Sequence, residues 1–179
     1  MATRPTIRAP EGSLSEDLAG HVKTFATRDQ NWKVFSFETA VNPKYARPQL
    51  RYLGTSGNVD HTDPKALMGR SFTFSLMQLP PGNEQPLHHH DEEEVFFVLE
   101  GTPTVVWEHG GEIVMREVGK WDLVYNPPGQ VHCIRNYSDA PCWFQVMLGN
   151  PKPPRPQYLD PELRKLQVHD RPDEIARAK

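Results

Sequence analysis

The amino-acid sequence predicts an all-β domain, a barrel or sandwich of short antiparallel strands. The chain has 179 residues, the size of one ordinary domain. Residues 71–79 alternate polar and apolar side chains almost strictly, the pattern of a strand with one buried face. Short apolar runs then follow at close intervals and are separated by turns rich in Gly and Pro. We find no internal repeat and therefore expect one barrel, over residues 70–150.

Residues 1–69 are expected to form an N-terminal arm, a helix and irregular strands packed on the barrel. Ser13 followed by Glu16 fits a capping box at the start of a helix. Apolar residues then recur every three or four positions, which gives the helix one apolar face before it ends near residues 27–29: Leu14, Leu18, Val22 and Phe25. Residues 34–38 and 49–53 are predicted strands, and residues 63–67 one helical turn.

The barrel region carries most of the predicted strands. They lie at 71–79, 94–99, 104–108, 112–117, 121–125, 132–135 and 142–148. The sequence His109-Gly110-Gly111 between two of them is typical of a hairpin turn. Residues 151–179 form a proline-rich C-terminal tail. Its first part, residues 151–156, cannot join a central strand, and a short helix follows with Pro161 at its first position.

Charge and composition exclude several classes of function. The formal net charge is −3, from 20 basic and 23 acidic residues, and no basic stripe is present, so nucleic-acid binding is unsupported. No apolar run reaches 18 residues and the N-terminus lacks an apolar signal region, so we expect no membrane association and a cytoplasmic location. The two cysteines, Cys133 and Cys142, are expected to be free thiols.

The chemically informative segment runs from residue 81 to residue 94. On a strand, alternate residues point the same way, so His88 and His90 present their imidazoles to one side. The Glu94 carboxylate can reach the same point if the chain bends back, and such a set suits first-row divalent metals. Histidines beside acids are more often a solvated loop, but this cluster lies directly between two core-forming strands.

Two motifs resemble those of the cupin superfamily. The first consists of Gly82, five residues, His88, one residue, His90, three residues, Glu94, six residues and Gly101. The second is similar to residues 127–136, which supply the proline, glycine, histidine (His132) and closing asparagine. One position departs from the pattern, because Trp121 replaces the glycine that opens the second motif.

The resemblance implies a double-stranded β-helix, or jelly-roll, barrel that holds one divalent metal ion. The implied ligands are His88, His90, Glu94 and His132. Iron is the favoured metal, and manganese, nickel or zinc would accept the same ligands. Four protein ligands would leave two octahedral positions open for water, substrate or dioxygen. A homodimer is expected from the resemblance alone.

Alternation along the strands suggests which side chains line a substrate pocket. The candidates are Phe96, Val98, Ile134, Tyr125, Phe144 and Gln78. Each is individually more often structural than substrate-binding. Arg51 or Arg47 can bind a substrate carboxylate through two hydrogen bonds, although surface arginines are more common. No catalytic residue is assigned.

Three functions remain open at this stage, because one fold hosts many chemistries. The first is an iron-dependent dioxygenase acting on a small aromatic or organic-acid substrate. The second is a metal-dependent isomerase, lyase or cyclase that uses the metal as a Lewis acid. The third is a non-catalytic small-molecule binding protein.

Overall fold

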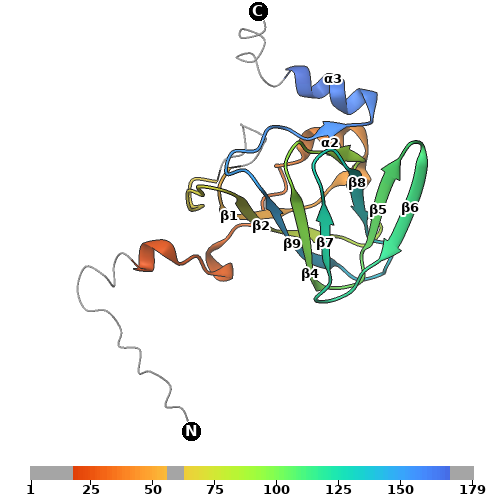
Figure 1. Ribbon diagram of the computed structural model, residues 1–179. Helices are drawn as coiled ribbons and strands as arrows, with labels where there is room; N and C mark the ends of the chain where they lie inside the picture. Colours follow the sequence, from red (N-terminus) through yellow and green to blue (C-terminus); the bar gives the residue numbers. More distant parts are fainter. Residues whose placement is uncertain (1–17, 56–62, 170–179) are drawn as a thin grey trace, which may run out of the picture.

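Two five-stranded antiparallel sheets pack face to face in a computed structural model, which describes residues 18–55 and 63–169 (Figure 1). One sheet has the order β1 (Gln49–Leu53), β2 (Thr73–Leu79), β9 (Cys142–Leu148), β4 (Glu94–Glu100) and β7 (Leu123–Asn126). The other has the order β10 (Gln157–Tyr158), β3 (His88–His89), β8 (Val131–Arg135), β5 (Thr104–His109) and β6 (Glu112–Glu117). The predicted all-β jelly-roll architecture is confirmed.

The helices are few and lie outside the sheets. They are η1 (Phe25–Thr27), α2 (Ser36–Val41), η2 (Pro43–Tyr45) and α3 (Pro161–His169). The predicted C-terminal helix is confirmed as α3, with Pro161 at its first position. Among the described residues, no helix combines the length and the apolar character that a membrane crossing requires.

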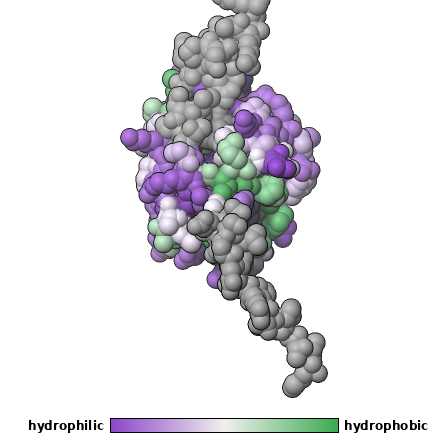
Figure 2. All heavy atoms as spheres, turned by 90° about the vertical axis from the view of Figure 1, so that its left-hand side faces the viewer, coloured by the Kyte–Doolittle hydropathy of each residue, from purple (hydrophilic) through white to green (hydrophobic). Residues whose placement is uncertain are grey.

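The predicted N-terminal helix is only partly visible. Residues 13–17 lie outside the described residues, residues 18–21 are helical, and the chain then leaves the helix before the short η1. The expected apolar face is not buried, because Leu18, Val22 and Phe25 are each more than half exposed. Figure 2 shows the side of the molecule that carries this segment, where apolar atoms gather near the centre of a largely hydrophilic surface.

The strand predicted at residues 34–38 is wrong, because this segment turns into α2. Val34 and Glu38 are the buried positions of the segment, and their four-residue spacing places them on one face of a helical turn. The apolar residues of this segment had suggested the two-residue period of a strand. A buried ion pair to Glu38 instead determines how the segment packs.

The turn before β7 accommodates the departure from the glycine of the second motif. Trp121 has a φ of 75°, and it is the one non-glycine residue with positive φ in the described part of the chain. Its backbone N–H donates to the Val98 carbonyl at 2.9 Å, and its exposed ring lies 5.9 Å from that of Phe97. The backbone therefore keeps the left-handed conformation that normally favours glycine.

A buried network of hydrogen bonds joins the N-terminal region to the C-terminal tail. Arg47 donates to both carboxylate oxygens of Glu38, at 2.6 and 3.2 Å. The Tyr158 hydroxyl on β10 donates to the same carboxylate at 2.5 Å. Burial, and next the Glu38 charge, raise the pKa of Tyr158 well above its usual value, so this phenol remains a donor.

Both cysteines are free and buried, as predicted. Cys133 follows the inward-pointing His132 on β8. Burial raises the pKa of the Cys133 thiol to about 11, despite the opposing effect of nearby Arg135.

We predict that Glu38→Gln destabilises the fold. Without the carboxylate, Arg47 remains a buried cation with no counter-charge, which costs roughly 3 kcal/mol. Urea denaturation followed by circular dichroism measures the free energy of unfolding. Asp29→Asn is the matched control, because Asp29 pairs with Lys65 on the exposed surface and its loss should leave the midpoint unchanged. An unchanged midpoint in Glu38→Gln contradicts the assigned role of the network.

We also predict that Cys133 resists alkylation in the folded protein at pH 8. Its pKa of about 11 leaves almost no thiolate at that pH, and the side chain has no exposed surface. Peptide mass spectrometry after iodoacetamide treatment, with and without denaturant, reads out the labelling. Rapid modification of Cys133 without denaturant would show that β8 does not pack as described.

Candidate metal centre

Four polar side chains meet between the two sheets. His88 lies on β3 and pairs in register with His132 on β8, while Glu94 begins β4 in the opposite sheet. His90 follows β3 directly. One potential ligand atom from each of the four residues lies within 4.8 Å of the others.

The four side chains are buried, which sets their protonation. Burial, and next the neighbouring His132, lower the pKa of His88 well below 6.5, and burial likewise lowers the pKa of His90. Burial alone would raise the pKa of Glu94, but His90 and His132 together hold it below its usual value. At neutral pH His88 and His90 are therefore neutral and Glu94 is ionised, the forms that bind metal ions.

Backbone carbonyl groups orient two of the imidazoles. His88 Nδ1 lies 2.8 Å from the Pro86 carbonyl oxygen, and His132 Nδ1 lies 2.8 Å from that of Gln130. A neutral imidazole that donates from Nδ1 presents a lone pair at Nε2. Carbonyl partners of this kind fix the tautomer and ring orientation of metal-binding histidines.

The contact between His132 and Glu94 brings two potential ligand atoms of the site together. His132 Nε2 lies 2.6 Å from Glu94 Oε2, and His90 Nε2 lies 3.8 Å from the same oxygen. Two atoms that both carry lone pairs repel at 2.6 Å unless a proton or a metal ion is shared between them. The donor set of three nitrogens and one carboxylate fits a first-row divalent metal.

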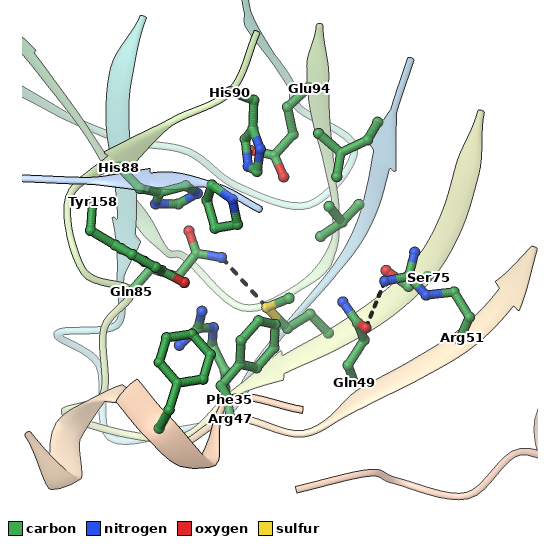
Figure 3. Close-up of a pocket in the computed structure, with 15 residues that line it drawn as sticks. Phe35, Arg47, Gln49, Arg51, Ser75, Gln85, His88, His90, Glu94 and Tyr158 are labelled. Carbon is green, nitrogen blue, oxygen red and sulfur yellow. Dashed lines mark hydrogen bonds and ion pairs between the residues drawn. The ribbon is translucent and has the colours of Figure 1, made fainter. Parts of the chain in front are cut away.

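A narrow pocket opens beside this cluster (Figure 3). Its cavity volume is about 70 Å³, room for only a small ligand. Besides His88, His90 and Glu94, the lining is Phe35, Phe37, Arg47, Gln49, Arg51, Ser75, Met77, Gln85, Val146, Leu148, Pro156 and Tyr158. The pocket is thus lined by both polar and apolar side chains in addition to the three residues of the cluster.

None of the six side chains proposed from the sequence lines this pocket. Four of them are completely buried in the core: Phe96, Val98, Ile134 and Phe144. Alternation did place the first two on the face that carries Glu94, where the ring of Phe96 packs against that of Phe144 at 5.5 Å. These four side chains fill the core beside the site and do not line its pocket.

The other two of the six point elsewhere. Gln78 is half-buried and alternates along β2 with the buried Met77 and Leu79, so it lies on the opposite face from the core. Tyr125 is exposed, donates to Glu93 at 2.9 Å, and lines a second groove over β5, β6 and β7.

The sequence reading missed Gln49, Ser75 and Gln85, and treated Tyr158 as part of the tail. The available signal was alternation along β1, where Gln49 and Arg51 share one face and both line the pocket. That signal is weak, because β1 has only five residues and lies far from the two motifs in sequence.

Comparison with known proteins identifies the family. A model described as "Cupin domain" matches residues 75–148. Dimethylsulfoniopropionate lyase DddQ of Ruegeria pomeroyi is 30% identical over 112 residues, covering 57% of this chain and 54% of that protein. Auxin-binding protein 1 of Arabidopsis thaliana is 27% identical over 112 residues, covering 60% and 54%. This chain thus spans about half the length of each of these relatives.

Structural comparison supports the same assignment at the level of fold. A variant of oxalate decarboxylase from B. subtilis is similar with a TM-score of 0.55 and 19% identity, covering 87% of this chain and 35% of that one. Two packed antiparallel sheets, the paired motifs and a His-His-Glu-His cluster agree with this match, so residues 75–148 of the chain form a cupin domain.

Proposed function

We propose that this protein is a metal-dependent enzyme that oxidises a small organic-acid or aromatic substrate with dioxygen, using one iron ion held by His88, His90, Glu94 and His132. The observation that carries the proposal is the meeting of four buried ligand atoms within 4.8 Å, three of them from residues that line a narrow pocket. A binding protein needs a pocket, but it does not need a reactive ion next to it.

The four proposed ligands would hold the ion, and neighbouring backbone groups orient two of them. A bound divalent iron would supply electron transfer between dioxygen and the substrate, whereas zinc or nickel would supply only Lewis acidity. Glu94 brings one negative charge, which partly balances that of the ion. The carbonyl groups of Pro86 and Gln130 hold His88 and His132 in one orientation.

The rest of the pocket determines what can enter. Phe35, Phe37 and Met77 line it with apolar surface, which limits the water that can reach the reacting groups. Arginine and amide side chains share this lining, and they favour a polar or anionic substrate over a purely apolar one. The small cavity favours a substrate of few atoms over a polymer.

A second candidate is Lewis-acid catalysis, as in a lyase, cyclase or isomerase. The specific observation that favours it is the similarity to a protein named as a lyase, which is 30% identical over the matched 112 residues. The same four ligands would serve such a reaction. A non-catalytic binding role is the third alternative, and the similarity to a protein named for auxin binding supports it.

We predict that protein purified without chelators carries about one divalent metal ion per chain. His90→Ala combined with His132→Ala removes half of the ligands and should weaken metal affinity by about 100-fold or more. Elemental analysis by mass spectrometry measures the content. His89→Ala is the matched control, since His89 sits between two proposed ligands but lies outside the cluster. Undiminished metal in the double variant would refute the site.

We predict that turnover requires dioxygen and iron. A screen of small organic and aromatic acids with an oxygen electrode identifies substrates by oxygen uptake, and product analysis is then repeated without oxygen and with zinc in place of iron. Product formation should stop in both cases. Turnover that continues unchanged without oxygen would exclude the oxidase reaction and establish the Lewis-acid class.

A further inference from the structure

Two arginines line the pocket, and the structure neutralises only one of them. Arg47 faces the Glu38 carboxylate, donates to the Tyr45 carbonyl at 2.8 Å, and stacks 3.8 Å from the centre of the Phe35 ring. Its charge is therefore balanced within the protein. Only its Nε lacks a hydrogen-bond acceptor.

Arg51 is equally buried but has no comparable partner. Its exposed fraction is 8%, and its Nη2 donates a hydrogen bond to the neutral amide oxygen Oε1 of Gln49 at 2.8 Å. Among the described residues, no carboxylate forms an ion pair with it, and its buried Nε has no acceptor. Asp63, whose charge reaches Arg51 at longer range, is paired with Arg28.

A buried cation without a counter-ion is costly, so its presence needs an explanation. Burial lowers the pKa of Arg51 to about 10, and the side chain therefore remains protonated at neutral pH. A guanidinium held in place by one amide keeps its other donors available in a rigid planar fork. Carboxylates match this fork with two parallel hydrogen bonds.

The strand register places Arg51 opposite a second unpartnered group. Arg51 on β1 pairs with Ser75 on β2, and Ser75 Oγ is buried without a hydrogen-bond partner. Both side chains line the pocket, and Figure 3 shows them together at one end, with His88, His90 and Glu94 at another. A ligand oxygen at the Arg51 end can thus accept from the guanidinium and from a hydroxyl.

The separation of the two ends limits the size of the ligand. Three strand spacings separate β1 from β4, since β2 and β9 lie between them, which amounts to about 14 Å between the backbones. The long side chains of Arg51 and Glu94 extend into this distance from both sides. The remaining gap suits a small molecule that reaches the metal centre with one group and Arg51 with another.

We propose that Arg51 is the specificity-determining residue of this site and binds the carboxylate of a small anionic substrate, with Ser75 as a second donor. This inference rests on the proposed function for the identity of the reacting end, and it narrows the substrate class to carboxylic acids. Gln49 acts as a positioning residue that orients the guanidinium.

The test compares acids with their neutral amides. Propionate and propionamide, and benzoate and benzamide, are titrated into metal-loaded protein at constant ionic strength by isothermal calorimetry. The unaltered protein should bind at least one acid and should bind the matching amide about tenfold more weakly or worse. Arg51→Gln should lose this preference, and Arg51→Lys should retain part of it, because lysine keeps the charge without the fork. Arg116→Gln, an exposed arginine on β6, is the matched control.

Equal binding of acid and amide by the unaltered protein would overturn the assignment, and this comparison decides it even if Arg51→Gln fails to fold. Full acid affinity in folded Arg51→Gln would also overturn it. Repeating the titrations on metal-free protein separates the two proposals. Arg51-dependent acid binding in a protein that takes up no metal ion would sink the enzyme proposal alone, whereas metal-dependent binding that ignores Arg51 would sink the present inference alone.

Discussion

The burial of polar and charged groups between two apolar sheets is the constraint on which this structure depends. An ionisable group placed there is costly without a partner, because the interior solvates charge poorly. The jelly-roll provides those partners from strands far apart in sequence: His132 on β8 faces Glu94 on β4, and their ring and carboxylate meet at 2.6 Å. A proton or a metal ion shared between the ring nitrogen and the carboxylate oxygen satisfies both groups.

The same constraint explains the second buried cluster. Glu38, Arg47 and Tyr158 come from α2, the segment after η2, and β10, and their hydrogen bonds tie both flanks of the chain to the sheets. The pocket lies between this network and the metal centre, with Arg47 and Tyr158 in its wall. The small cavity therefore lies between polar groups on both sides, the Glu38 cluster and the metal centre. Large apolar side chains at these positions would fill it.

Sequence reasoning succeeded where a periodic pattern and a local motif agreed. Alternation located β2 and β4, and the spacing of His88, His90 and Glu94 brought together residues that do converge with His132. It failed at α2, where the buried Glu38 finds its partner nine residues away and local periodicity carries no sign of that pair. It also took the inward positions Phe96 and Val98 for pocket walls, because a pattern of burial does not distinguish a filled core from a cavity.

The pocket is lined by residues inside the cupin match and by residues outside it, and this division bears on what determines substrate specificity. The family match begins at residue 75 and ends at residue 148, so it includes the proposed metal ligands. Arg47, Gln49 and Arg51 precede it and Tyr158 follows it, yet all four line the same cavity. The matched domain therefore contains the proposed metal centre, while the flanking segments supply four of the six polar or charged lining residues outside that centre. Since one fold serves many reactions, the choice of substrate in this chain is best sought in the flanks, and first at the arginine that has no counter-charge of its own.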